Sequence, residues 1–153
     1  MIEEDIENKH LWEVKLDKVP CVDRVLQELK IRYKLGIITN TVTSREKHVR
    51  SALRKIGIER YFDAIVTSVD VGYEKPDTRI FLVALMKLGV AASEAVMVGN
   101  RISKDILGAN RLAMKSVLYK WNDRYADTIT SDLDKPDYTI NSLTELLPLL
   151  SKI

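Results

Sequence analysis

Short apolar runs alternate with amphipathic segments along the chain from about residue 20 onward. Runs rich in β-branched residues are typical of buried strands, and they are found at 33–39, 63–68, 95–98, 116–119 and 138–140. Between them, apolar residues recur every three or four positions, as they do in helices. The segments with this spacing are 21–30, 43–56, 78–88, 104–114 and 142–150.

Strands that alternate with helices in this way predict right-handed βαβ units. We therefore expect a three-layer α/β fold, in which a Rossmann-like parallel sheet carries helices on both faces. The 153 residues suit one domain. Residues 1–19 are ambiguous, because Ile6, His10 and Val14 share a helix face whereas Trp12, Val14 and Leu16 alternate as in a strand.

Composition and charge exclude several classes of protein. The net charge is only +2, with 24 basic and 22 acidic residues, so we expect no nucleic-acid partner. Apolar runs too short to cross a bilayer and the lack of a signal segment predict a soluble, cytoplasmic protein without membrane contact. The one cysteine, Cys21, is expected to be a small buried residue.

Polar residues follow three of the predicted strands. Thr39 and Asn40 end the first, Lys75 lies in the loop after the second, and Asn100 and Asp105 follow the strand 95–98. In an open parallel sheet, ligands bind at the carboxyl ends of the strands. A hydroxyl, an ammonium group and hard oxygen donors at one edge suit a phosphoryl group and Mg²⁺. Each residue also has a structural alternative, as a turn former, a solvated lysine or a helix cap.

These segments resemble the second, third and fourth motifs of the haloacid dehalogenase-like (HAD) hydrolase superfamily. The matching stretches are Leu35–Asn40, Lys75–Asp77 leading into Arg79–Phe81, and Val98–Asn100 with Asp105 and Gly108–Ala109. The tail from Pro136 to Leu143 resembles the last strand and helix of such proteins. The resemblance covers roughly Val19 to the C-terminus, with the motifs in their usual order.

The resemblance implies a Mg²⁺-dependent phosphatase that acts on a small phosphorylated metabolite through an aspartyl-phosphate. Thr39 and Lys75 would be the catalytic residues, and both would bind substrate together with Asn40. Asp105 and Asn100 would hold the metal. Asn100 stands where the family more often has aspartate, so the metal site is expected to be electrostatically weaker.

The first motif of the superfamily, an apolar strand ending in Asp-x-Asp, has no counterpart in this sequence. Asp5-Ile6-Glu7 has acids at the right interval, but Glu3-Glu4 before it cannot form a buried strand. We therefore expect residues 1–19 to be a remnant of the cap helix or a linker, and residues 20–153 to be a HAD-like core that lacks its usual first strand and nucleophile.

In the family, the missing strand lies between those at Ile37-Ile38 and Val96-Met97, so its loss would leave two buried edges unpaired. One hypothesis is that Trp12–Leu16 fills the gap and brings Asp17 to the site as a substitute nucleophile. Other possibilities are a partner chain that supplies the strand, a longer form of the gene product, a homo-oligomer, or direct pairing of the flanking strands.

Two functions therefore remain open at the level of the sequence. The first is an impaired or incomplete HAD-type phosphoric monoester hydrolase, so that enzymatic activity is uncertain. The second is a non-catalytic module of the same fold that binds phosphate, metal or a protein partner.

Overall fold

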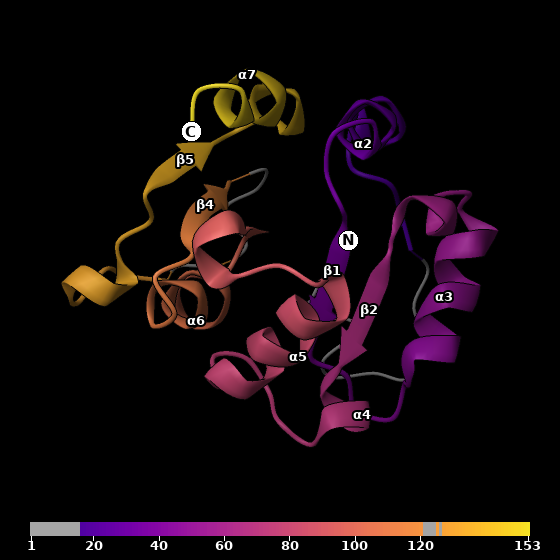
Figure 1. Cartoon of the computed structure of the whole chain (residues 1–153), viewed down its shortest axis with the longest axis horizontal. Coiled ribbons are helices and arrows are strands. Elements are labelled where there is room, and N and C mark those ends of the chain that lie inside the picture. Colours follow the sequence, from indigo (N-terminus) through magenta and orange to yellow (C-terminus); the bar gives the residue numbers. More distant parts are fainter. Residues whose placement is uncertain (1–15, 121–124, 126) are drawn as a thin grey trace.

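A computed structural model describes residues 16–120, 125 and 127–153. Its strands form two parallel sheets (Figure 1). The first sheet pairs β1 (Gly36–Thr39) with β2 (Ala64–Thr67). In the second, β4 (Lys115–Tyr119) lies between β3 (Val96–Gly99) and β5 (Tyr138–Ile140).

Helices connect the strands and cover them. The α-helices are α2 (Val22–Lys30), α3 (Glu46–Lys55), α4 (Ser68–Val71), α5 (Thr78–Leu88), α6 (Leu107–Asn110) and α7 (Leu146–Leu150). Short 3₁₀ turns are η2 (Glu59–Tyr61), η3 (Ala92–Glu94), η5 (Asp132–Asp134) and η6 (Leu143–Glu145), and η4 (Ile102–Ile106) is a π-helical turn. No helix in the described part of the chain is long and apolar enough to cross a bilayer.

Alternate residues of each strand point to opposite faces, and this produces three layers. Ile37 and Ile65 pack with α3 and with Leu26 of α2 on one face. Ile38 and Val66 pack against α5 on the other face. The expected α/β fold, with parallel strands and helices on both faces, is thereby confirmed.

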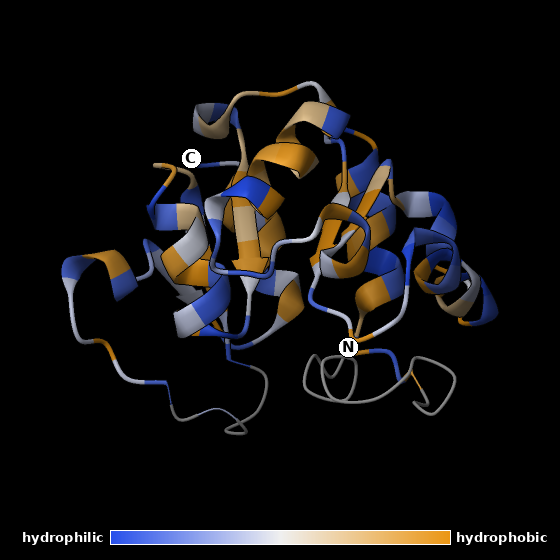
Figure 2. Ribbon diagram, turned by 90° about the horizontal axis from the view of Figure 1, so that it is seen from below, coloured by the Kyte–Doolittle hydropathy of each residue, from blue (hydrophilic) through white to orange (hydrophobic). Residues whose placement is uncertain are grey.

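Two helices pack against both sheets. Helix α2 contributes Leu26 to the cluster around α3, and Val25 and Leu29 to a cluster with β4, β5 and α7. Helix α5 packs on β1 and β2 and also contacts α6. Figure 1 shows α2 and α5 on opposite sides of β1, and Figure 2 shows hydrophobic residues gathered in the strands and the helices around them. The helix layers therefore hold together a sheet that is divided in the middle.

The flanking strands β1 and β3 do not pair with each other, so the hypothesis of direct pairing is wrong. No other strand among the described residues lies between them. The proposed substitute strand falls mostly on residues 12–15, outside the described residues, and Leu16 and Asp17 belong to no strand. The sheet thus lacks a central strand within the described part of the chain.

Local differences from the sequence prediction have physical causes. The helix expected over 104–114 is replaced by η4 and the short α6, and Ala113 has a positive φ of 54° before β4. Cys21 is exposed, contrary to expectation, because it precedes α2 with a φ of 63° and the buried face of α2 begins only at Val25. At the start of the helical segment 142–150, Ser142 and Glu145 form a capping box at η6.

Candidate active site

Four of the five predicted site residues are buried at the carboxyl edge of the strands. The exposed fraction is 1% for Thr39, 3% for Asn40, 2% for Lys75 and 0% for Asp105. The Lys75 ammonium donates a hydrogen bond of 2.7 Å to Oδ1 of Asp105. This ion pair joins the loop before α5 to the turn after β3, and so connects the two sheets at the predicted site.

Asn40 holds the loop that carries Lys75. Its Oδ1 accepts from the backbone N–H of Lys75 at 2.8 Å, and its Nδ2 donates to the Lys75 carbonyl at 3.2 Å. A side-chain amide can make this two-point contact because it carries both a donor and an acceptor. Asn40 therefore positions Lys75 through its backbone in this structure.

Thr39 is the last residue of β1, and its hydroxyl makes one long hydrogen bond of 3.3 Å to the carbonyl of Asn40. Next to it, Ser68 accepts from the backbone N–H of Thr41 at 2.9 Å and donates to the Thr41 carbonyl at 3.1 Å. Sequence analysis missed Ser68, which links the ends of β1 and β2. Its only signal was a hydroxyl at the last position of a predicted strand, 63–68.

The turn after β3 is built around Asp105. Its Oδ2 accepts from the backbone N–H of Arg101 at 3.1 Å, while Oδ1 is bound by Lys75. A Cβ on Gly99 would lie 2.4 Å from this carboxyl group, so only glycine allows the carboxylate to sit against the end of the strand. The π-helical turn η4 carries the chain from β3 back over this contact.

A second set of side-chain contacts at this edge of the sheet was not predicted from the sequence. The Arg101 guanidinium lies 4.2 Å from the centre of the Tyr125 ring, and its Nε is 3.4 Å from Oδ2 of Asp127. The backbone N–H and hydroxyl of Ser103 also donate to Asp127. This contact ties residues after β4 to the turn after β3, and such a long-range pairing leaves no local pattern in the sequence.

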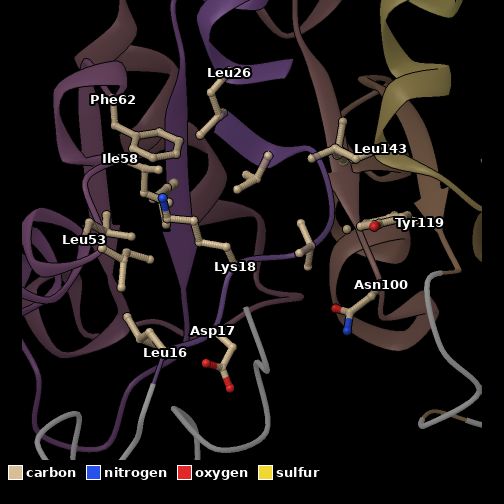
Figure 3. A pocket seen from close by; sticks show the side chains of 16 residues that line it. Leu16, Asp17, Lys18, Leu26, Leu53, Ile58, Phe62, Asn100, Tyr119 and Leu143 are labelled. Atoms are coloured by element: carbon tan, nitrogen blue, oxygen red, sulfur yellow. The ribbon is translucent and has the colours of Figure 1, made fainter. Parts of the chain in front are cut away.

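Asn100 lines a cleft that Lys75 does not line. It is half-buried and lines an open cleft of 270 Å³ between the two sheets. The side chains of Asp17 and Asn100 lie at the same end of this cleft (Figure 3). Its walls are mainly apolar and come from β1, β3, α2 and α3. The five predicted residues thus form a buried group of four and a fifth residue at the cleft.

The described residues do not form a magnesium site by themselves. Mg²⁺ needs near-octahedral oxygen ligands and usually one or two carboxylates. Both oxygens of Asp105 already accept hydrogen bonds, one of them from an ammonium group. The described residues contain no group of three or more His, Cys, Asp or Glu side chains suited to a metal ion.

The sequence does contain one Asp-x-Asp triplet, Asp132-Leu133-Asp134, but it forms η5 rather than the end of a strand. Oδ2 of Asp134 accepts from the hydroxyl of Thr130 at 2.6 Å and from Ser131 at 3.2 Å. The hydrogen bond from Thr130 is the main cause that lowers the pKa of Asp134. Asp134 therefore stabilises a turn and does not replace the missing first motif.

Comparison with known proteins agrees with this geometry. Residues 2–119 match the family described as haloacid dehalogenase-like hydrolase. The chain belongs to this family. It is 37% identical over 142 residues to the glyceraldehyde 3-phosphate phosphatase of Methanopyrus kandleri, covering 90% of this chain and 58% of that protein. It is 32% identical over 148 residues to the ribulose-1,5-bisphosphate 5-phosphatase of Halopiger xanaduensis, covering 92% and 61%.

A solved HAD phosphatase from Thermococcus onnurineus has the same fold. It superposes with a TM-score of 0.70 at 38% identity, covering 86% of this chain and 57% of that chain. The chain therefore spans little more than half the length of these relatives. Within that span, the HAD-like core predicted from the three motifs is confirmed.

Proposed function

We propose that this chain provides the phosphate-binding part of a HAD-type hydrolase that acts on a small sugar phosphate. The observation that carries the proposal is the buried ion pair of Lys75 and Asp105, together with the two hydrogen bonds by which Asn40, the residue after the buried Thr39, holds the Lys75 backbone. Two relatives named as phosphatases of glyceraldehyde 3-phosphate and ribulose-1,5-bisphosphate support the substrate class.

In this proposal each residue has a defined role. The Thr39 hydroxyl donates a hydrogen bond to a phosphate oxygen, because its present bond to Asn40 is long and easily exchanged. Lys75 neutralises phosphate charge as a point cation, and Asp105 and Asn40 hold it in place. Asn100 and Asp105 would contribute two oxygen ligands to Mg²⁺ only after additional carboxylates complete the site.

The attacking carboxylate is the part that the described residues do not supply. No apolar strand ending in Asp-x-Asp occurs in the sequence, and Asp17, which lines the cleft, belongs to no strand. Without a nucleophile, positioning and charge neutralisation favour binding of phosphate more than its transfer. We therefore expect the chain alone to bind phosphate and to hydrolyse esters very slowly.

The same observation favours a second candidate, a non-catalytic module that retains affinity for phosphate. Phosphorus NMR of inorganic phosphate, together with hydrolysis of a chromogenic phosphate ester in the presence of Mg²⁺, separates the two. The hydrolase is supported if Lys75→Ala abolishes phosphate binding and if slow ester hydrolysis is lost in both Lys75→Ala and Asp105→Ala. Binding without turnover supports the module, and turnover that survives both substitutions contradicts the assigned site.

A further inference from the structure

The connection between β4 and β5 is tied to the elements that follow β3 by polar contacts at two places. Near its start, the carboxylate of Asp127 contacts the turn after β3. Further along, Nδ2 of Asn110, the last residue of α6, donates to the carbonyls of Leu133 at 2.7 Å and Lys135 at 2.9 Å. The 3₁₀ turn η5 in this connection also contacts α6 and η4 (Figure 1). The segment 127–135 is therefore held at both ends.

Asp127 holds the turn after β3 at two residues. Its Oδ2 accepts from the backbone N–H of Ser103 at 3.3 Å and from Nε of Arg101 at 3.4 Å. The Ser103 hydroxyl lies 3.2 Å from each carboxylate oxygen, and the Arg101 guanidinium also lies over the Tyr125 ring. Only 21% of the Asp127 side chain and 16% of the Arg101 side chain are exposed. The pair is thus partly shielded from water, which strengthens it relative to an ion pair on an open surface.

The turn that Asp127 holds is the one that orients Asp105. The backbone N–H of Arg101 donates to Oδ2 of Asp105 at 3.1 Å, and the Arg101 carbonyl accepts from the Asp105 N–H at 2.8 Å. The other carboxylate oxygen, Oδ1, accepts from the Lys75 ammonium at 2.7 Å. Asp127 thus binds the side chain of the residue whose backbone orients the Asp105 carboxylate. That carboxylate in turn fixes the Lys75 ammonium.

We propose that Asp127 is a positioning residue of the phosphate site, which acts on Lys75 through Arg101 and Asp105. Without the Asp127 carboxylate, the turn after β3 loses these contacts and holds Asp105 less firmly in one orientation. The Lys75 ammonium is then less well placed for a phosphate oxygen, and the lost preorganisation lowers phosphate affinity. The effect on phosphate rests on the proposed function, whereas the coupling of Asp127 to Asp105 does not.

The sign of the effect separates positioning from simple electrostatics. Asp127 is an anion that is paired with the cation Arg101. Removing a negative charge near an anion site strengthens the binding of phosphate through Coulomb's law. Positioning predicts the opposite sign, because the affinity then depends on where the Lys75 ammonium lies. Weaker phosphate binding after removal of the Asp127 carboxylate is therefore the signature of positioning.

Titration of the full chain with inorganic phosphate, followed by phosphorus NMR, tests the proposal with a matched pair of variants. Asp127→Ala removes the contacts of the segment with the turn after β3, and Asn110→Ala removes its two contacts with α6. We expect Asp127→Ala to weaken phosphate binding about five- to tenfold and Asn110→Ala to change it less than about twofold. Unchanged or tighter binding in Asp127→Ala, or equal weakening in both variants, overturns the proposal.

The carboxyl carbon of Asp105 and the ammonium nitrogen of Lys75 provide NMR readouts that need no phosphate. Both resonances should shift in Asp127→Ala and stay unchanged in Asn110→Ala, which a general loosening of the segment would not produce. Ser103→Ala removes one exposed hydroxyl and should shift them less, so it decides the question if Asp127→Ala does not fold. Resonances that do not move overturn the proposal. Shifted resonances in a chain that binds no phosphate would support the coupling to Asp105 and overturn the proposed function instead.

Discussion

The helix layers and the sheet layer of this protein differ in continuity. On one face, α2 packs against both sheets through Leu26 on one side and Val25 and Leu29 on the other. On the opposite face, α5 reaches from β1 and β2 to α6. The sheet between them is divided, and its two parts are joined at the carboxyl edge by Lys75 and Asp105. The connection between the halves therefore rests on helix packing and one buried ion pair rather than on strand pairing.

Breaking the buried ion pair should have the largest effect on this connection. Asp105→Ala leaves the Lys75 ammonium buried without its carboxylate, and we expect a loss of about 3–5 kcal/mol in the free energy of unfolding. Urea denaturation measures the loss. The matched control is the double variant Lys75→Met/Asp105→Leu, which removes both charges and should recover most of the stability. A loss below about 1 kcal/mol in Asp105→Ala would show that the pair does not join the halves.

Crowding the contact between α5 and α6 should have the next largest effect. A Cβ at Gly108 would lie 2.3 Å from the ring of Phe81, which is fully buried. We expect Gly108→Ala to cost about 1–3 kcal/mol in thermal or urea unfolding. Phe81→Leu added to Gly108→Ala should restore part of the loss, whereas Leu82→Ala, at an exposed position of α5, should restore none. If Phe81→Leu and Leu82→Ala restored the stability of Gly108→Ala equally, the contact between Gly108 and Phe81 would not be the cause of the loss.

Features that depend on local patterns or on general rules of the fold could be predicted from the sequence. Helix α5 was predicted at its observed bounds, because Asp77 caps its start and Gly89 ends it in the left-handed conformation. The buried contact between Lys75 and Asp105, which follow different strands, agrees with the rule that parallel strands end at one edge. Local patterns and fold rules were sufficient for both.

Other features depend on contacts between distant residues and left no local signal. The sequence suggested Asn40 as a substrate ligand, whereas its amide is engaged by the backbone of Lys75, 35 residues away. In the π-helical turn η4, the Asp105 carboxyl group lies close against Gly99. Cys21 was expected to be buried because of its residue type, yet its place before α2 exposes it.

A smaller effect is expected at Asp63, which anchors the start of β1. Its Oδ2 accepts from the backbone N–H of Leu35 at 2.8 Å, and its carboxylate pairs with Lys30. Burial raises the pKa of Asp63, but the hydrogen bonds from Lys30 and Leu35 outweigh it, and the net pKa is below the usual 3.8. Asp63→Asn keeps an acceptor for Leu35, so we expect a loss of about 1 kcal/mol at neutral pH.

The pH dependence of stability identifies the charge of Asp63 as the cause. A carboxyl group with a lowered pKa in the folded state stabilises the fold above its unfolded pKa, and this contribution disappears as the pH falls through the folded pKa. The difference between the parent chain and Asp63→Asn should therefore be constant near neutrality and shrink below about pH 4. A difference that stays constant down to pH 2 would assign the effect to packing instead.

The smallest effect on stability, with the clearest effect on binding, is expected at Thr39. Thr39→Val has a similar shape, and the hydroxyl that it removes makes only the 3.3 Å bond to the Asn40 carbonyl, so unfolding should change by less than about 1 kcal/mol. If that hydroxyl binds phosphate, affinity for inorganic phosphate should fall by roughly five- to tenfold, as expected for one hydrogen bond to a charged group. Thr39→Ser, which keeps the hydroxyl, is the matched control and should bind within about twofold of the parent. Equal phosphate affinity in Thr39→Val and Thr39→Ser would remove Thr39 from the site and leave Lys75 as its anion-binding residue.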